Sequence, residues 1–426
     1  MQDTVHISMD QLQVGLYIYL DLKWFDQPFT FSNFKIKSEE QIKIIRSLGL
    51  RTVRCNPTLS SVEVPPDKPQ AAPAAPAAPG LAPNVSPALV AKRAMIERIK
   101  LQREATAQVE KAFAGTASAL RDIDKNLLSK PVESVRQAGE LVQQIADSIL
   151  GEPELAIQVM GDNPGGEELY LHSLNVTVLS MMMARDIKLP AQVLGALGMG
   201  ALFHDIGHKK IPSAILLSMA PLSTAERHLY QMHVLYGGEV GKLLQLPPSV
   251  LAIIREHHEL SDGSGYPAGL QGEAIGLLSR IVAIANHYDE LCNPVNINDA
   301  LTPHEALSQM FAKQRSKFDA KLLQVFIRCL GVYPPGTIVQ LSNGVLGMVT
   351  TINTIKPMKP MIMVYDADVP KEEAILIDME HETEINIAKA IRPAHVAREV
   401  YNYLSPRKRV SYYFGAGKPG QEAAAR

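Results

Sequence analysis

Cysteine and tryptophan are scarce in this chain, whose 426 residues include three cysteines and one tryptophan. Because Cys55, Cys292 and Cys329 are odd in number and far apart, they provide neither a disulfide framework nor a CxxC pair for structural zinc. This usage excludes a small secreted fold held by disulfides. We expect a reduced, cytoplasmic compartment.

Neither sign of charge is in excess, and long apolar runs are missing. The 42 lysines and arginines nearly balance 44 aspartates and glutamates, for a formal net charge of -2, so the whole chain indicates no DNA-binding surface. The first ten residues, MQDTVHISMD, lack the basic and then apolar order of a signal peptide. No run approaches the roughly 20 apolar residues that a membrane span needs. We therefore expect no membrane span and no DNA partner.

Alanine and proline fill residues 61–87, where stretches such as AAPAAPAAP leave almost nothing to bury. This composition predicts a partly extended linker. Before it, residues 14–22, 29–36 and 52–56 are rich in β-branched and aromatic side chains, which favours strands, and residues 38–50 have the pattern of a helix with a serine cap. A small α+β domain over residues 1–60 is predicted.

Helical periodicity dominates the middle of the chain. Residues 88–130 are predicted to hold one long helix, a candidate for dimerisation, and residues 131–332 carry apolar side chains at spacings of three and four. From residue 333 to 426 the period changes to two, with Asn343 and Gly344 marking a hairpin and a basic tail at the end. The expected fold class is mainly α: an all-helical core, a small α+β domain before it and a small β module after it.

Histidines concentrate in the helical region, where eight of the twelve lie between His172 and His287. Glu168 and His172 are four residues apart, so a carboxylate and an imidazole share one helix face. Nitrogen and oxygen ligands without nearby cysteine suit iron, manganese or zinc in a catalytic rather than a structural site. The candidate ligands, in chain order, are Glu168, His172, His204, Asp205, His233, His257 and His258.

Each of these elements has an ordinary explanation when it occurs alone. A His-Asp pair at a helix end, or a glutamate and a histidine four apart, is usually a solvated contact. A double histidine near a helix terminus often only meets the last carbonyls. The joint occurrence of all of them within one helical domain favours a metal centre.

The order of these motifs resembles the HD-GYP branch of the HD-domain metal phosphohydrolases. The resemblance covers about residues 165–330 and is carried by HDIG from His204, HHELSDGSGYPAGLQGEAI from His257 and RIVAIANHYDEL from Arg280. It implies an all-helical fold with two or three divalent metal ions, usually iron or manganese, that hydrolyses cyclic di-GMP to linear pGpG or to GMP in bacterial signalling. The N-terminal segment also resembles a small domain of unknown function found before such domains.

The resemblance assigns the histidines above and Asp205 as metal ligands, with Glu168 as the extra carboxylate of trinuclear members. One ligand departs from the family, which usually has an aspartate where this chain has Asn286. A neutral amide oxygen still coordinates a cation, but less strongly than a carboxylate. Asp289, one turn later, either compensates or only caps the helix.

The residues expected to contact the substrate phosphate depart further from the family pattern. Members of the family typically have a lysine, which approaches a substrate phosphate, where this chain has His208, followed by Lys209 and Lys210. His208 is a candidate proton donor to a leaving oxygen, and Lys209 a candidate replacement for the missing charge; the alternative for both lysines is a solvated face. The arginine that often grips the dinucleotide is not visible near Val295.

The candidate catalytic residues are therefore Asp205, His208 and Lys209. The GYP loop should shape the substrate pocket, because its glycines permit tight turns and Tyr266 offers a ring and a hydroxyl. The candidate substrate-binding residues are Asp262, Gly265, Tyr266 and Pro267, together with Lys209.

Three functional hypotheses follow. The first is a cyclic di-GMP phosphodiesterase that acts through a metal-bound hydroxide. The second is a catalytically degenerate binding or signalling module with regulatory protein partners, which Asn286, His208 and Val295 favour. The third is a hydrolase of the same fold that acts on another cyclic nucleotide. Retention of every histidine ligand favours an enzyme, because buried imidazoles are unfavourable unless they are satisfied.

Overall fold

The computed structural model describes residues 4–22, 27–29, 32–64, 115–116, 118–151, 168–353, 356–367, 369–371, 374–382 and 385–404. Contacts divide the chain into two compact units, Met1–Gln102 and Arg103–Arg426. The linker predicted at residues 61–87 and most of the long helix predicted within 88–130 lie outside the described residues. Of that helix, residues 118–126 are described and are helical.

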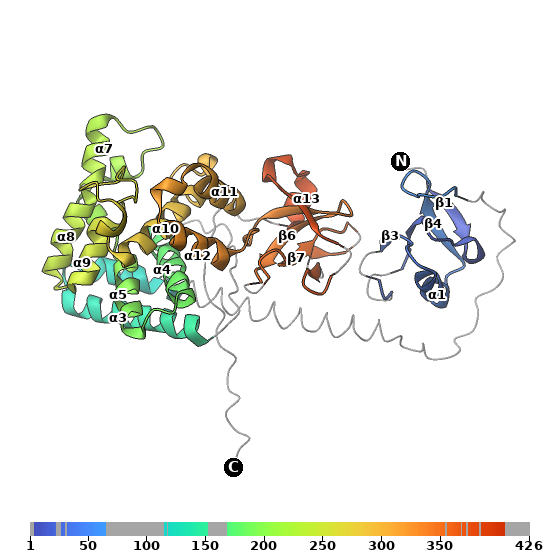
Figure 1. Ribbon diagram of the computed structural model, residues 1–426, viewed down its shortest axis with the longest axis horizontal. Helices are drawn as coiled ribbons and strands as arrows, with labels where there is room; N and C mark the ends of the chain where they lie inside the picture. The colour runs from blue at the N-terminus through green and yellow to red at the C-terminus, as the bar shows by residue number, and fades with distance from the viewer. Residues whose placement is uncertain are drawn as a thin grey trace, which may run out of the picture. The chain divides into compact units, whose positions relative to one another are not determined.

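The first unit is built on a four-stranded antiparallel sheet with the strand order β1-β4-β2-β3 (Figure 1). Ser38 caps α1 by accepting a hydrogen bond from the Gln41 backbone, as the serine in the sequence predicted. Sequence reasoning missed β1, which pairs with β4 along its whole length. The elements are β1 Val5–Ser8, β2 Tyr17–Tyr19, β3 Asn33–Lys35, α1 Glu39–Ser47 and β4 Thr52–Asn56, with the 3-10 turn η1 at Met9–Gln11.

The second unit begins with a helical bundle (Figure 1). Its helices are α3 Pro131–Gly151, α4 Glu168–Asp186, α5 Ala191–Leu202, α6 Ser213–Leu216, α7 Thr224–Gln231, α8 His233–Leu243, α9 Pro248–Glu256, α10 Leu277–Cys292, α11 Pro303–Lys313 and α12 Ala320–Leu330. Short 3-10 turns interrupt them: η3 Ile206–Lys210, η4 Gly272–Ala274, η5 Ile297–Asp299 and η6 Arg315–Lys317.

Helix α4 runs through the middle of this bundle. Residues 174–184 are all buried, and α4 contacts α3, α5, α10 and α12. A helix that is apolar on all sides is stable only when neighbours cover every face, and this explains the run of three methionines in LSMMMA. The helices that contact α4 therefore pack around it, and together they form one hydrophobic core.

A five-stranded antiparallel sheet with the order β8-β7-β6-β5-β9 follows the bundle. The predicted hairpin at Asn343 and Gly344 is confirmed, since Gly344 has a φ of 87° in the turn between β5 and β6. The elements are β5 Ile338–Leu341, β6 Leu346–Thr351, β7 Met361–Val364, β8 Ile375–Asp378, β9 Ile387–Ile391, η8 Pro393–His395 and α13 Arg398–Leu404. The predicted basic tail lies outside the described residues.

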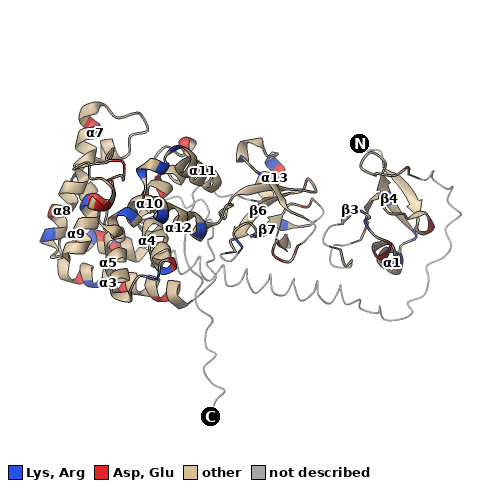
Figure 2. Cartoon of the chain, in the orientation of Figure 1, with Lys and Arg blue, Asp and Glu red and all other residues tan. Residues whose placement is uncertain are grey.

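The predicted fold class is therefore confirmed, with a mainly helical core between a small α+β domain and a small β module. In Figure 2 lysines and arginines alternate with aspartates and glutamates over the helices, and the described residues form no stripe of one sign in that view. No described helix has both the length and the apolarity that crossing a bilayer requires. The exact domain boundaries stay predictions.

Candidate metal centre

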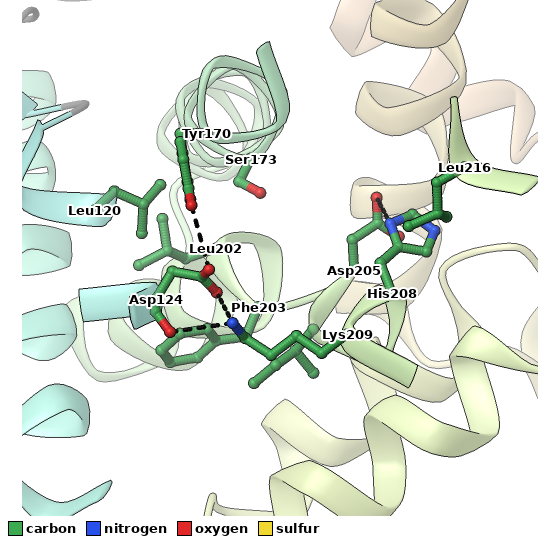
Figure 3. Close-up of a pocket in the computed structure, with 11 residues that line it drawn as sticks. Leu120, Asp124, Tyr170, Ser173, Leu202, Phe203, Asp205, His208, Lys209 and Leu216 are labelled. Carbon is green, nitrogen blue, oxygen red and sulfur yellow. Dashed lines mark hydrogen bonds and ion pairs between the residues drawn. The ribbon is translucent and has the colours of Figure 1, made fainter. Parts of the chain in front are cut away.

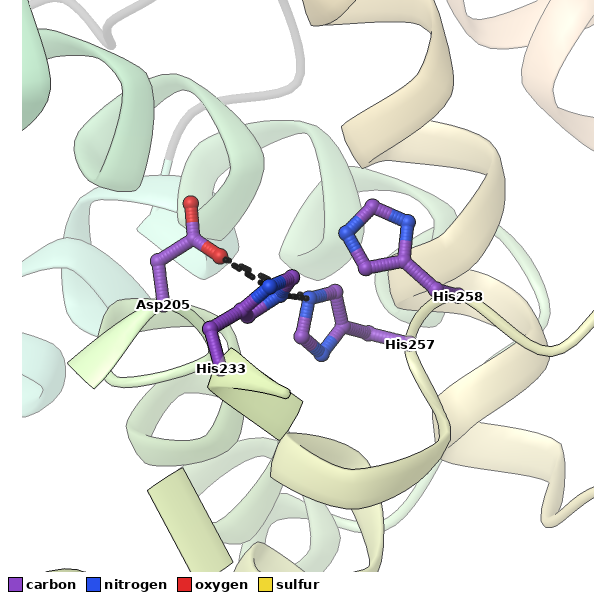
Figure 4. Close-up of side chains that lie close together, drawn as sticks. All are labelled: Asp205, His233, His257 and His258. Carbon is purple, nitrogen blue, oxygen red and sulfur yellow. Dashed lines mark hydrogen bonds and ion pairs between the residues drawn. The ribbon is translucent and has the colours of Figure 1, made fainter. Parts of the chain in front are cut away.

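Two groups of possible metal ligands meet at one aspartate. His172, His204 and Asp205 form the first group, and Asp205 with His233, His257 and His258 forms the second; within each group the ligand atoms lie within 4.8 Å of one another. Figure 4 shows the four side chains of the second group pointing toward one another. The predicted convergence of imidazoles from separate helices is present in the structure.

Asp205 divides its two carboxylate oxygens between the groups. Its Oδ2 lies 3.6 Å from His172 Nε2 and 3.4 Å from His204 Nε2. Its Oδ1 lies 3.4 Å from His233 Nε2 and 3.5 Å from His257 Nε2. A carboxylate in this position can bridge two cations, one in each group.

Three of the histidines sit at the C-terminal ends of helices, where the last backbone carbonyls lack helical partners. His204 Nδ1 bonds the Ala201 carbonyl at 2.7 Å, just after α5. His233 Nδ1 bonds the Tyr230 carbonyl at 2.7 Å after α7, and His257 Nδ1 bonds the Ile254 carbonyl at 2.9 Å after α9. Because a carbonyl only accepts, each Nδ1 carries the proton and each Nε2 has a free lone pair. A histidine oriented in this way is ready to bind a metal through Nε2.

His172 is held by a carboxylate instead. Its Nδ1 donates to Asp289 Oδ2 at 2.7 Å, and Asp289 Oδ1 accepts from the side-chain amides of Asn175 and Asn293, each at 2.8 Å. Asp289 is fully buried. Both of its oxygens accept from side chains, so Asp289 orients His172. A role for it in compensating for Asn286 stays a prediction.

The facing ring nitrogens show that this site suits a cation. His233 Nε2 and His257 Nε2 lie 3.3 Å apart, although both rings already donate their Nδ1 proton elsewhere. Two lone pairs at that distance repel one another unless a positive charge lies between or beside them. Asp205 Oδ1 is buried beside them without a hydrogen-bond donor among the described residues. A divalent cation satisfies all three atoms at once.

Protonation states in the second ligand group agree with this interpretation. Burial lowers the pKa of His233 to about 3 and also lowers the pKa of His257 and His258. Burial opposes ionisation of Asp205, but the imidazoles of His204 and His208 outweigh it and hold the pKa of Asp205 well below its usual range. Neutral imidazoles and an ionised carboxylate are the forms that bind metal. At His172, burial is outweighed by the hydrogen bond and charge of Asp289, which raise the pKa of that ring to about 9 in protein without metal.

Two glycines let the backbone pass close to the site. A Cβ at Gly207 would collide with the His233 carbonyl and the Gly237 amide, so only glycine lets η3 pack on α8. A Cβ at Gly265 would likewise collide with the backbone of residues 258–260, which brings the GYP loop against the double histidine. The glycines of both motifs are thus explained by close packing.

Glu259 fixes the remainder of that loop. It is 2% exposed, and its two carboxylate oxygens accept the backbone N–H groups of Ala268 at 2.7 Å and Leu270 at 2.8 Å. Tyr266 stacks its ring on His258, with centroids 4.6 Å apart. The loop therefore presents Tyr266 directly at the second ligand group.

One cavity of about 200 Å³ opens next to Asp205 and His208 (Figure 3). His208 lies 3.4 Å from Asp205 through Nδ1, and its buried Nε2 has no hydrogen-bond partner among the described residues. In Figure 3 the Lys209 side chain runs away from these two residues toward Asp124, with 2.7 Å between Nζ and Oδ1. The Tyr170 hydroxyl donates to the same carboxylate at 3.3 Å.

A second cavity, of about 210 Å³, borders the other ligand group. His257, His258, Gly265 and Tyr266 line it, as do Asn286 and Glu290 of α10. The Asn286 amide donates from Nδ2 to Glu290 Oε1 at 3.1 Å. Asn286 thus lies beside the second group, where a ligand atom was predicted.

Other predicted residues do not converge. The side chain of Glu168 lies outside the described residues, although α4 begins there. Asp262 and Pro267 are exposed and border neither cavity; Asp262 instead accepts hydrogen bonds from Ser264 within its own turn. Lys210 pairs with Glu239 on the surface, as the solvated alternative predicted. Roles in binding substrate stay predictions.

Sequence reasoning gave no role to Asp124, Glu259 or Glu290. Glu259 directly follows the double histidine, and Glu290 is four residues after Asn286, so adjacency and helical spacing pointed to both. Asp124 offered no signal, because 85 residues separate it from Lys209.

Comparison with known families agrees with the geometry. A family model described as HD domain matches residues 154–322, which include every ligand of the two groups. This stretch of the chain is therefore similar to the HD domain family. A domain of unknown function (DUF3391) matches residues 4–138, and a KOW domain associated with HD domains matches residues 338–399. The resemblance noted in the sequence is confirmed.

Several phosphodiesterases are similar to this chain. Cyclic di-GMP phosphodiesterase PA4108 of Pseudomonas aeruginosa is 28% identical, over 84% of both chains. The cyclic di-GMP phosphodiesterase response regulator RpfG of Xanthomonas campestris is 31% identical over 38% of this chain and 43% of its own. The 3'3'-cGAMP-specific phosphodiesterase 2 of Vibrio cholerae is 26% identical over 50% of this chain and 42% of its own.

Among solved structures, Bd1817, a HDG"Y"P protein of Bdellovibrio bacteriovorus, is similar over 76% of this chain and 98% of its own. The sequence identity is 18% and the TM-score 0.41.

Proposed function

We propose that this protein is a metal-dependent phosphodiesterase that hydrolyses cyclic di-GMP to linear pGpG or to GMP. The observation that carries the proposal is the pair of ligand groups sharing Asp205, with three Nε2 lone pairs fixed by backbone carbonyls. The similarity to PA4108, which extends over 84% of both chains, supports the choice of substrate. The relatives that are matched over half of this chain or less support the reaction class.

Divalent cations held by these residues would activate a water molecule and neutralise charge on the phosphoryl oxygens. Asp205 supplies one oxygen to each group, and Asp289 keeps the His172 Nε2 lone pair turned inward. In the reaction, the water oxygen forms a bond to phosphorus, the bond from phosphorus to the ribose 3' oxygen breaks, and a proton passes to that leaving oxygen.

His208 is the residue best placed to handle that proton. It faces Asp205 through Nδ1 and lines the cavity with its unpartnered Nε2. Burial lowers the pKa of His208, so near pH 7 the ring is neutral, with Nδ1–H toward Asp205 and a lone pair on Nε2. Nε2 can therefore take a proton from the attacking water and pass it to the leaving oxygen. Tyr266, stacked on His258, offers its hydroxyl and ring to the nucleotide at the second cavity.

Cyclic GMP-AMP is the second candidate substrate. Proteins of Vibrio cholerae described as 3'3'-cGAMP-specific phosphodiesterases 1 and 2 are 31% and 26% identical to this chain over 37% and 50% of its length. Both substrates present the same phosphodiester to the metal centre, so the bases alone distinguish them.

A binding module without turnover is the less favourable alternative. His233 and His257 are at most 1% exposed, and their facing Nε2 atoms are unsatisfied without a cation. A fold that had lost its chemistry would gain stability by replacing such groups with apolar side chains.

Iron or manganese is the proposed metal, because the donor set consists of nitrogen and oxygen with no cysteine. The described cysteines are free and buried, which fits the proposed cytoplasmic location. Dimerisation through the helix that follows the linker, and partner proteins that regulate the enzyme, remain part of the proposal.

The test is hydrolysis by anaerobically purified protein, with metal analysis of the same sample. Cyclic di-GMP and 3'3'-cGAMP are supplied separately, and the products are identified by chromatography and mass spectrometry. The variant His204→Ala/Asp205→Ala should lose metal and all turnover. Glu239→Gln, which changes an exposed glutamate on α8, is the matched control. Unchanged turnover in the double variant would refute the proposed mechanism.

A further inference from the structure

Asn286 is a buried amide that is only half satisfied. It is 2% exposed and lines the second cavity together with His257 and His258. Its Nδ2 donates to Glu290, whereas its buried Oδ1 has no hydrogen-bond partner among the described residues. A buried carbonyl oxygen left without a partner is unfavourable. An electropositive group in the cavity would meet that oxygen.

Glu290 decides which way this amide points. It lies one turn after Asn286 on α10, and its Oε1 is 3.1 Å from Nδ2. Because Oε1 of Glu290 accepts this hydrogen bond, the amide turns its NH2 group toward Glu290 and its oxygen away from it. Glu290 therefore fixes Asn286 Oδ1 as the atom that is available to a cation.

Negative charge is otherwise sparse around the site. Asp205 is the one carboxylate in the two ligand groups found among the described residues. Asp289 lies at Nδ1 of His172 and already accepts hydrogen bonds from three side chains. These donors compensate its negative charge. Two divalent cations need more negative charge than a single carboxylate provides, because buried charge is stable only when it is paired. Glu290 borders the second cavity and can provide it.

We propose that Glu290 is a positioning residue of the metal centre. It holds Asn286 Oδ1 toward the cation beside His257 and His258, and through the shared hydrogen bond it supplies the negative charge that an amide lacks. This inference rests on the metal centre of the proposed function. In this inference Asn286 supplies the coordinating oxygen and Glu290 supplies the negative charge, whereas a single ligand carboxylate would supply both.

The test measures metal binding rather than turnover. Protein stripped by a chelator is reloaded with Mn²⁺, and its affinity and stoichiometry are determined by chelator competition and elemental analysis. Glu290→Gln retains the size of the side chain and an accepting oxygen but removes the charge. We expect Mn²⁺ to bind about 10- to 100-fold more weakly to this variant, the usual effect of removing a residue that supports a ligand.

A second variant separates this role from a general role in folding. Asn286→Asp combined with Glu290→Gln returns the charge to position 286 and reverses the donor and acceptor of the hydrogen bond, so the Mn²⁺ affinity should return to within a few-fold of wild type. Glu239→Gln, an exposed glutamate on α8, should bind Mn²⁺ as wild type does.

Three results would contradict the inference. Wild-type Mn²⁺ affinity in Glu290→Gln would show that the charge has no effect on the metal. A double variant that folds, as judged by urea unfolding, but binds as weakly as Glu290→Gln would show that Glu290 has only a structural role. Wild-type protein that binds no metal at all would remove the metal centre itself, and with it the proposed function.

Discussion

Replacing Asp289 with asparagine should weaken metal binding indirectly, by changing the hydrogen bond that orients the ligand His172. Asp289 Oδ2 accepts the His172 proton at 2.7 Å, while Oδ1 accepts from Asn175 and Asn293. An asparagine has one oxygen for these three donors. If that oxygen faces the two amides, the new NH2 group faces His172 Nδ1 and drives the ring proton to Nε2, where the metal should bind. If it faces His172, three NH2 groups meet in the core.

The magnitude follows from the pKa of His172 in protein free of metal. Burial lowers this pKa, but the hydrogen bond and charge of Asp289 outweigh burial and raise it to about 9. A histidine whose pKa is raised on folding contributes stability that is fully present below about pH 6.5 and is lost as the pH rises through 9. The difference between those pKa values corresponds to about 3 kcal/mol.

The assay is urea unfolding of wild-type and Asp289→Asn protein, both stripped of metal, at several values between about pH 6 and pH 9.5. The difference in unfolding free energy between the two proteins should shrink by about 3 kcal/mol across this range, because the wild type alone loses the contribution of His172. After reloading, the variant should bind Mn²⁺ about 10- to 100-fold more weakly.

A difference that stays constant with pH would refute the link between Asp289 and His172 protonation. Equal Mn²⁺ affinity in the two proteins would refute the claim that Asp289 fixes the tautomer of the ring. The two readouts are independent, because the first needs no metal.

Four further predictions concern the supports of the site. Glu259→Ala removes the acceptor of the Ala268 and Leu270 N–H groups and should lower the unfolding free energy by about 1 to 3 kcal/mol and raise KM, with metal retained. Gly207→Ala should cost about 3 kcal/mol or more in urea unfolding, whereas Gly195→Ala, which has open space around it, should change stability by less than about 1 kcal/mol. Asp124→Ala frees the Lys209 ammonium and should lower KM for cyclic di-GMP several-fold; an unchanged KM would argue against a phosphate contact. Burial lowers the pKa of His208, His233, His257 and His258, so the stability that these neutral rings allow is present above about pH 6.5 and is lost as the pH falls through their lowered pKa values. Metal content of the second ligand group, measured by elemental analysis, should therefore fall in that acid range and not near pH 6.5.

Much of the fold could be predicted because its signals are local. The helical period of two hundred residues, the serine cap at Ser38 and the hairpin at Asn343 and Gly344 each depend on neighbours in sequence. The strand β1 was missed for the same reason, since its four residues alternate too briefly to stand out and become a strand only by pairing with β4.

The metal ligands could also be predicted from the sequence, but the residues that orient them could not. A histidine is a recognisable ligand from its chemistry alone, whereas Asp289 becomes a support only because α4 and α10 pack side by side and bring it to His172, 117 residues away. The same holds for Asp124 and Lys209. Such contacts depend on how the helices pack against one another, and no local sequence pattern predicts that packing.

The ends of the helices explain why this bundle can build a metal site at all. The last carbonyls of a helix need donors, and at the ends of α5, α7 and α9 the Nδ1–H groups of His204, His233 and His257 supply them. One hydrogen bond thus satisfies the helix, fixes the tautomer and aims Nε2 inward. Because each residue of a helix turns by about 100°, the length of each helix decides where its terminal ring points. The spacing of these three histidines in the sequence therefore reflects helix lengths. Three ligands of the centre are placed by where helices stop, whereas His172 is carried on the face of α4.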